Sequence, residues 1–186
     1  MMMNEMQLIE KINALPAGNH VIAIDGRCAA GKSTLARKLS ALTGAGIIHM
    51  DDFYLPMEMR TVDRLAEPGG NVYYERFLEE VIPFLKQNRP FSYRRFECSI
   101  MDLGEVCQVP TSRFTIVEGA YSCHPKLGDY MSLRVFADVE QEMQLERIRS
   151  RNGEQKLQQF IEKWIPMEEA YFAAYQIQEK SDIILK

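Results

Sequence analysis

One short segment of the chain has the residue types and spacing needed to bind a phosphorylated ligand. Residues 26–33 read GRCAAGKS, a full match to the pattern G-x4-G-K-[ST]. Gly26 and Gly31 would let the backbone N–H groups of such a loop curl around an anion without Cβ clashes. Lys32 would reach the terminal phosphates of a nucleoside triphosphate, and the Ser33 hydroxyl would ligate Mg²⁺. The motif therefore predicts a site for a magnesium nucleoside triphosphate.

We call residues 26–34 the phosphate loop and expect the whole loop to contact the nucleotide. Cys28 is a spacer residue within it, and we favour an inert role for its thiol over an oxidant-sensitive one. Lys32 is the member with an expected catalytic role, because it would stabilise charge on the transferred phosphoryl group. The loop consists of Gly26, Arg27, Cys28, Ala29, Ala30, Gly31, Lys32, Ser33 and Thr34.

Two acidic segments could complete such a site. Asp51 and Asp52 follow the strand-like residues 47–50, and Glu118 ends a β-branched run. If both runs are parallel strands, their carboxyl ends meet at the edge of the sheet where ligands bind in open α/β folds. We expect Asp51 to accept the proton of an attacking hydroxyl and, with Glu118 and Ser33, to lie near the metal. Asp52 is the alternative base, and helix capping or loop ordering is the alternative role for either aspartate.

Arginines follow a segment of helical apolar periodicity, at Arg147, Arg149 and Arg151. Arginines there could close over a triphosphate and spread the charge of the transition state. We assign that catalytic role to Arg149 and Arg151. The alternative is a solvated basic helix end, which the helix dipole favours.

Four further side chains are candidates for contact with a second substrate: Tyr54, Arg60, Tyr93 and Phe96. Arg60 could touch an anionic group, with a solvated loop as the alternative. Tyr93 and Phe96 could stack on a planar base, with core packing as the alternative. The three histidines, His20, His49 and His124, show no metal-binding spacing, so we expect structural roles for them.

Strands and helices alternate along the chain in a way that would position these residues. The segments 20–24, 47–50, 113–117, 133–138 and 182–185 have strand character. The segments 5–15, 32–42, 74–86, 139–151 and 154–179 have helical character, with Pro83 and Pro166 expected to interrupt two of them. This alternation predicts a mostly parallel sheet with helices on both faces. Residues 91–96 and 105–109 predict a hairpin in an insertion at about residues 88–110, either a substrate-binding element or a decorated loop.

Composition limits the remaining function classes. The chain has 186 residues, 46% of them hydrophobic, so we expect a single domain over residues 1–186. Its net charge of −4 disfavours a nucleic-acid partner. No apolar run approaches the roughly 20 residues of a membrane span, no signal peptide is visible, and the four cysteines show neither CxxC nor zinc spacing. We expect a cytoplasmic protein without a membrane partner, and the sequence leaves a homo-oligomer open.

The order of these motifs resembles the uridine kinase family of P-loop nucleoside kinases, with phosphoribulokinase and pantothenate kinase as more distant relatives. The resemblance rests on the phosphate loop, DDFY at 51–54, PFSYRRF at 90–96, VEGAY at 117–121, the arginine cluster at 147–151 and SDII at 181–184. It implies a P-loop NTPase fold with a five-stranded parallel core, and transfer of the γ-phosphoryl group of ATP to a hydroxyl with Mg²⁺ as cofactor. It also implies Asp51 as base, Glu118 near Mg²⁺, Tyr93 near the nucleoside, and a helical lid segment at about residues 147–166.

Three departures from the family pattern bear on the acceptor. Asp51-Asp52 stands where the family has one acid followed by serine, the arginine cluster is sparser, and residues 97–102 contain no histidine to read a pyrimidine. Uridine or cytidine is the leading acceptor, and another nucleoside, a sugar or a pantothenate-like alcohol is the reserve. A nucleotide-dependent switch or regulator is the alternative class, although the chain contains neither N-K-x-D nor LSGGQ.

Overall fold

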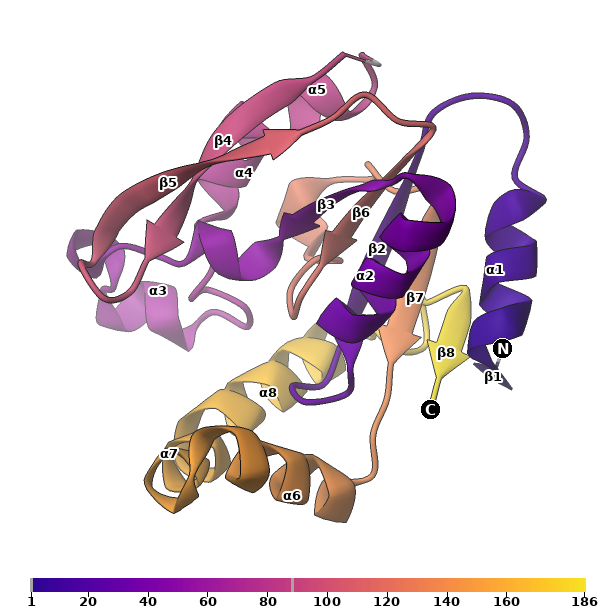
Figure 1. The fold of residues 1–186 in the computed structure, drawn as a ribbon. Helices are drawn as coiled ribbons and strands as arrows, with labels where there is room; N and C mark the ends of the chain where they lie inside the picture. The colour runs from indigo at the N-terminus through magenta and orange to yellow at the C-terminus, as the bar shows by residue number, and fades with distance from the viewer. Residues whose placement is uncertain (1, 88) are drawn as a thin grey trace.

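A parallel β-sheet forms the centre of the protein (Figure 1). The computed structural model describes residues 2–87 and 89–186, so residue 1 and residue 88, the first of the predicted insertion, lie outside it. All strand pairs of the central sheet are parallel, in the order β1-β8-β7-β2-β6-β3. The strands are β1 (Met2–Met3), β2 (His20–Gly26), β3 (Gly46–His49), β6 (Phe114–Glu118), β7 (Leu133–Ala137) and β8 (Ile183–Leu185).

The five predicted strands are confirmed, and a sixth is added at the edge. In β6 every residue is buried, as expected for a strand that helices cover on both faces. The added strand β1 pairs with β8 through Met2–Ile184 and Met3–Leu185. Two residues are too few to show a periodic pattern, so the sequence gives no signal for β1.

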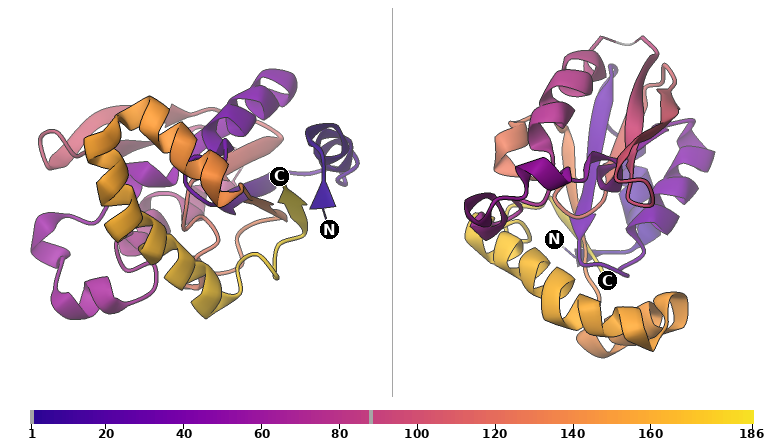
Figure 2. Two further views of the ribbon diagram at one scale, coloured as in Figure 1. Left: turned by 90° about the horizontal axis from the view of Figure 1, so that it is seen from below. Right: turned by 90° about the vertical axis from the view of Figure 1, so that its left-hand side faces the viewer.

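Helices cover both faces of the sheet, as predicted (Figure 2). On one face, α1 (Glu5–Asn13) and α2 (Lys32–Thr43) pack with β2, β6 and β7 in one apolar cluster. On the other face, α4 (Tyr74–Glu80) and α8 (Ile165–Tyr175) belong to a second cluster that includes Phe77 and Tyr171. The α/β architecture is therefore confirmed.

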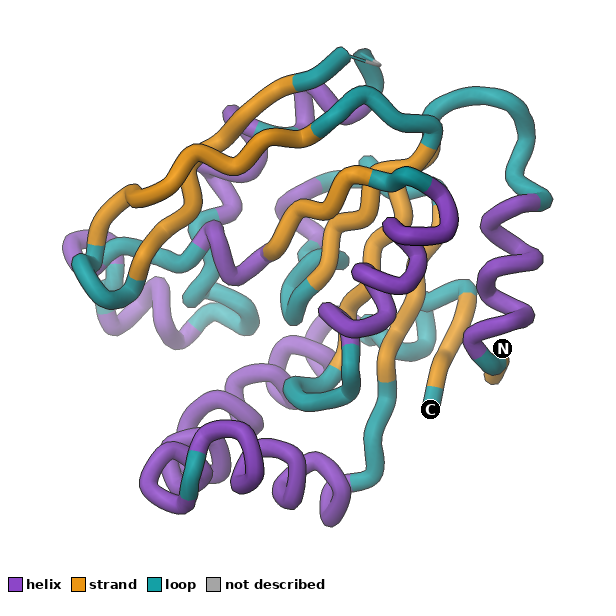
Figure 3. The backbone as a smooth tube through the Cα atoms, in the orientation of Figure 1, coloured by secondary structure: helices purple, strands orange, loops and turns teal. Residues whose placement is uncertain are grey.

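The predicted hairpin is present as a separate antiparallel pair, β4 (Phe91–Glu97) and β5 (Asp102–Val109), which arches over the edge of the fold (Figures 1 and 3). The predicted helical break near Pro83 is confirmed, since α4 ends at Glu80 and α5 begins with Pro83 in its first turn. Three short elements lead from β3 to α4: the 3₁₀ turns η1 (Met50–Phe53) and η2 (Met57–Met59), and the helix α3 (Val62–Ala66). Helix α5 (Ile82–Leu85) follows α4.

A helical arm lies beyond the carboxyl ends of the strands (Figures 1 and 2). It consists of α6 (Gln141–Asn152), α7 (Glu154–Gln159), the π-helical turn η4 (Phe160–Trp164) and α8. The interruption expected at Pro166 takes the form of a π turn and not of a helix end: η4 directly precedes α8, whose first turn contains Pro166. A π turn at this point accommodates the missing N–H and the ring of the proline. The expected end at residue 179 is wrong: α8 ends at Tyr175, and Gln176 takes a left-handed conformation with φ 55°. In the described part of the chain, no helix is long and apolar enough to cross a membrane.

Candidate active site

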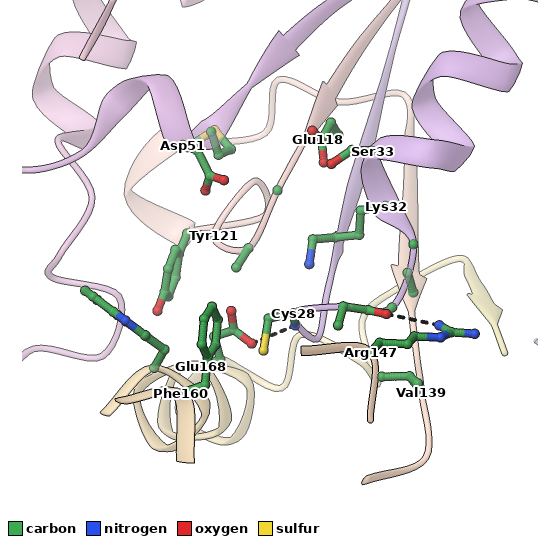
Figure 4. A pocket seen from close by; sticks show the side chains of 18 of the residues that line it. Cys28, Lys32, Ser33, Asp51, Glu118, Tyr121, Val139, Arg147, Phe160 and Glu168 are labelled. Carbon is green, nitrogen blue, oxygen red and sulfur yellow. Dashed lines mark hydrogen bonds between the residues drawn. The ribbon is translucent and has the colours of Figure 1, made fainter. Parts of the chain in front are cut away.

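A cleft of about 1490 Å³ opens at the carboxyl ends of β2, β3 and β6. Its walls come from the phosphate loop, η1, the segment that follows β6, and the helical arm. Figure 4 shows Lys32, Asp51, Glu118 and Glu168 around this space, each from a different element. The sheet topology thus brings together acidic and basic residues that lie far apart in the sequence.

The phosphate loop presents hydrogen-bond donors to the cleft. Gly31 has a left-handed backbone with φ 89°, and α2 begins directly after it at Lys32. The N–H groups of the first turn of a helix have no acceptor within that helix, so those of Lys32 and Ser33 are available to a ligand. The Lys32 ammonium is ordered beside them, because Nζ donates to the carbonyl oxygens of Gly26 at 2.7 Å and Arg27 at 2.8 Å. This arrangement fits an anionic phosphate group.

The two glycines of the motif serve different purposes. A Cβ at Gly26 would lie 2.1 Å from the carbonyl oxygen of Ala137, so only glycine lets β2 approach β7 this closely. A Cβ at Gly31 would meet no atom within 4 Å, so that position needs glycine for its positive φ alone.

Helix α8 holds the first turn of the phosphate loop. The Cys28 N–H donates to Glu168 Oε2 at 2.8 Å, and Arg27 Nε donates to Glu169 Oε1 at 2.7 Å. Arg27 also pairs with Asp138, at the end of β7. The Arg27 side chain therefore points to α8 and β7, and it is absent from the described cleft lining, in contrast to Cys28 and the rest of the loop that follows. The contact of Arg27 with the nucleotide stays a prediction.

The Cys28 thiol lies in an environment that suppresses ionisation. Burial and the neighbouring Glu168 carboxylate raise the pKa of Cys28 to about 12. Gln144 Nε2 lies 3.2 Å from Sγ and 3.0 Å from the Cys28 carbonyl oxygen. Because the thiolate is the reactive form, these surroundings favour the inert role.

A fully buried carboxylate lies beneath the loop. Asp25 accepts hydrogen bonds from the backbone N–H groups of Gly26, Tyr121 and Cys123 and from the Tyr171 hydroxyl, the last at 2.8 Å. Burial raises the pKa of Asp25, while the donors of Cys123, Tyr171 and Gly26 and the charge of Lys32 oppose that shift. Asp25 thus ties the start of the phosphate loop to the segment after β6 and to α8.

The two adjacent aspartates point to different sides. Asp51 lines the cleft, whereas Asp52 is turned toward the hairpin, where its Oδ2 accepts a hydrogen bond from the Tyr93 hydroxyl at 2.7 Å. The Asp51 side chain is exposed in the cleft, and the surrounding protein partly desolvates its carboxylate. This desolvation, together with the charges of Glu118 and Asp52, raises the pKa of Asp51, and Lys32 partly offsets the rise.

Glu118 lies at the end of β6 and is almost fully buried. Its Oε1 accepts a hydrogen bond from His49 Nδ1 at 2.5 Å, and this bond, with the charges of Asp52 and Asp51, raises the pKa of His49. The structural role expected for His49 therefore includes orienting an acidic residue of the cleft.

The donor set of the cleft fits magnesium bound together with a nucleotide. Ser33, Asp51 and Glu118 line the cleft, and the described residues include no cluster of three His, Cys, Asp or Glu side chains that could hold a metal unaided. Magnesium usually takes one or two carboxylates and completes its shell with substrate phosphates and water. Ser33 and the acidic residues are therefore suited to a metal that arrives with its phosphates.

Only part of the arginine cluster faces the cleft. Arg147 and Arg151 line it, and Arg147 Nη1 donates to the carbonyl oxygen of Ala29 at 3.0 Å. Arg149 is absent from the described lining, and its Nε donates to Glu154 Oε2 at 2.8 Å. Residues four apart share a helix face, whereas the residue midway between them points away. The sequence therefore already indicates that Arg147, and not Arg149, shares a helix face with Arg151. The catalytic role of Arg149 stays a prediction.

The four candidate substrate residues divide into two pairs. Tyr54 and Arg60 line the cleft, and the Arg60 guanidinium lies 4.5 Å from the Tyr54 ring centroid. Tyr93 and Phe96 are buried and are not among the described lining residues. Tyr93 holds Asp52 and packs 5.1 Å from the Phe53 ring, which agrees with the packing alternative. Phe96 packs behind Tyr54, with ring centroids 6.1 Å apart.

Sequence reasoning misses three residues that shape the site: Asp25, Trp164 and Glu168. Asp25 lies inside an apolar strand, directly before the motif, and a lone acid at such a position is a signal of a buried hydrogen-bond network. Trp164 ends the π turn η4 and Glu168 lies in α8, and the alignment of both elements with the phosphate loop depends on the path of the chain through α6 and α7. No local pattern reports that path.

Comparison with known proteins identifies relatives in fold. No protein-family model matches this chain, and no curated protein matches it. A possible uridine kinase from Bacillus stearothermophilus is similar over 98% of this chain and 97% of its own, with a TM-score of 0.77 and 18% identity. A provisionally named fructose transport system kinase from a Silicibacter species is similar over 98% of both chains, with a TM-score of 0.66 and 19% identity. The chain has the P-loop α/β fold of these kinase-like structures, as its sequence predicts.

Proposed function

We propose that this protein is an ATP-dependent kinase that transfers the γ-phosphoryl group to a hydroxyl of a small molecule. One observation carries the proposal: Lys32 and the free amides of the phosphate loop share a cleft with Asp51, whose carboxylate faces that cleft. A phosphate-binding loop opposite a carboxylate of raised pKa suits phosphoryl transfer to an alcohol. The names of two proteins with this fold agree with the proposal.

The nucleotide would bind with its phosphates on the loop and on the N-terminus of α2. The loop amides and Lys32 would hold the β- and γ-phosphates, and Ser33 with Glu118 would hold Mg²⁺. Asp51 would lie near the metal with its carboxylate free to accept a proton. Bound Mg²⁺ supplies charge neutralisation at the phosphate oxygens. His49 would keep the Glu118 carboxylate oriented through the hydrogen bond described above.

Transfer would require one proton acceptor. The acceptor hydroxyl oxygen forms a bond to the γ-phosphorus while the bond from that phosphorus to the β,γ-bridging oxygen breaks, and ADP leaves with the electron pair. The hydroxyl proton passes to the Asp51 carboxylate, whose raised pKa makes it a better base than an ordinary aspartate. Arg147 and Arg151, on the cleft face of α6, would stabilise the charge on the phosphoryl oxygens.

Residues 1–186 would form one kinase domain, in which the lid segment 147–166 lies over the nucleotide. The hairpin insertion acts on the acceptor side, where it positions the DDFY segment from behind through Tyr93 and Phe96. The resemblance to uridine kinases puts a nucleoside first among the acceptors, followed by a sugar or a pantothenate-like alcohol.

The test is acceptor-dependent release of ADP from Mg-ATP, measured over a panel of nucleosides, sugars and acidic alcohols. We expect one acceptor to raise the rate, and Lys32→Ala and Asp51→Asn to lower it by about 10² or more. Arg113→Gln is the matched control, because Arg113 donates to the Leu15 carbonyl at the far end of the sheet. Slow ATP hydrolysis that no acceptor accelerates would favour a nucleotide switch instead.

A further inference from the structure

Arg60 is a cationic side chain of the cleft with an incomplete set of partners. Its Nε donates to the Leu55 carbonyl oxygen at 2.8 Å, and its Nη1 lies 3.1 Å from Met57 Sδ. Its Nη2 is buried and has no hydrogen-bond partner in the described part of the chain. All of the partners that it does have are uncharged.

Other buried or partly buried arginines of this protein form an ion pair with a carboxylate. Arg27 pairs with Glu169, Arg64 with Glu75, and Arg76 with Glu80. No such ion pair involves Arg60 among residues 2–87 and 89–186. A guanidinium taken out of water without a counter-ion carries an electrostatic cost that an anion would offset.

The surroundings of Arg60 fix its position and add a second cation. The Tyr54 ring lies under the guanidinium, and the Trp164 ring lies 6.0 Å from the Tyr54 ring. Lys163 Nζ in turn lies 4.6 Å from the Trp164 centroid. All four of these residues line the cleft. The cationic groups of Arg60 and Lys163 thus lie on either side of the aromatic pair formed by Tyr54 and Trp164.

We propose that the phosphoryl acceptor carries an anionic oxygen group, a carboxylate or a phosphate, which binds the cleft-lining guanidinium of Arg60 with Lys163 as the second cation. The inference rests on the proposed function, because it places the anion on the molecule whose hydroxyl Asp51 deprotonates. A neutral nucleoside would leave the Arg60 guanidinium without a charged partner. An acidic alcohol or a sugar phosphate is therefore favoured over uridine and cytidine.

The test is direct binding of matched probes that differ in the anionic group: glycerate against glycerol, pantothenate against panthenol, and ribose 5-phosphate against ribose. Calorimetry is done on the full chain saturated with Mg²⁺ and a non-hydrolysable ATP analogue, so that the phosphate loop is already filled. In at least one pair we expect the anionic member to bind about 10- to 100-fold more tightly, since a charge-assisted hydrogen bond is at stake. Whether a carboxylate or a phosphate responds identifies the anion.

Variants assign the preference to Arg60. Arg60→Gln should bring the anionic and neutral members to near parity, whereas Arg60→Lys should retain part of the preference. Arg89→Gln is the matched control, because the Arg89 guanidinium also lies over an aromatic ring, that of Phe84 at 5.1 Å, and does not line the cleft. Thermal unfolding of each variant establishes that it is folded.

Three results would overturn the inference: no anionic probe binds, the neutral members bind as tightly, or the preference survives in Arg60→Gln. Failure of the kinase proposal has a different signature. An anionic alcohol that binds through Arg60 but accepts no phosphoryl group from ATP would refute the transfer reaction and leave the anion site standing.

Discussion

The hydrogen bond from Tyr171 to Asp25 offers a direct test of how α8 supports the phosphate loop. Both residues have an exposed fraction of 0%, and the hydroxyl lies 2.8 Å from the carboxylate Oδ2. Tyr171→Phe removes this donor, and no water can replace it without a cavity. Three backbone N–H donors remain on Asp25, so the loss is that of one hydrogen bond to a charged group, about 1.5–3 kcal/mol in the free energy of unfolding.

The assay is thermal and urea unfolding of the purified protein. For a chain of this length the expected loss corresponds to a fall in Tm of about 3–12 °C. Tyr175→Phe is the matched control: it lies one turn further along α8, its ring also packs on His124, and its hydroxyl has no hydrogen bond among the described residues. We expect that control to change stability by less than about 0.5 kcal/mol. Equal losses in the two variants would refute the view that Asp25 fastens α8 to the loop.

Three further predictions follow from the same geometry. Gly26→Ala should destabilise the fold by at least about 2–4 kcal/mol, because the new Cβ would meet the backbone of Ala137; unfolding at the wild-type temperature would contradict this. Cys28 should be alkylated by iodoacetamide far more slowly than the exposed Cys98 at neutral pH, as read by mass spectrometry, because burial raises its thiol pKa to about 12; equal rates would be the contrary result. The pKa of Asp51 is raised above the ordinary aspartate value of 3.8, so acidification protonates and disables this base at a higher pH than it would an unperturbed aspartate. We therefore expect kcat/KM with an identified acceptor to begin to fall at that higher pH. Asp51→Asn should abolish that acid limb, and a retained limb would assign it to another group.

The sequence predicts those features that depend on local pattern. Five buried strands, their alternation with helices, and the GRCAAGKS motif between β2 and α2 are legible because each is encoded within a dozen residues. Asp51 and Asp52 face opposite sides, but they do so in the 3₁₀ turn η1 and not in an extended chain. These features are enough to locate the cleft at one end of the sheet.

Features that depend on distant contacts are not legible in this way. The hydrogen bond from the Cys28 N–H to Glu168 joins residues that are 140 positions apart in the sequence. The Tyr93 hydroxyl donates to Asp52 only because the hairpin folds back over η1. Arg149 is a different case, because helical spacing already indicates that Arg147 and Arg151 share a face without it. The absence of a carboxylate partner for Arg60 becomes visible only when the described residues are placed in space.

The most direct test of the proposed function is to incubate the protein with Mg-ATP and a cell metabolite extract and to identify the products by mass spectrometry and ³¹P NMR. The account predicts that one hydroxylated metabolite is depleted, that a product with one additional phosphoryl group appears in equal amount with ADP, and that Lys32→Ala forms neither. Stoichiometric release of inorganic phosphate from ATP without any phosphorylated metabolite would contradict the assignment as a small-molecule kinase.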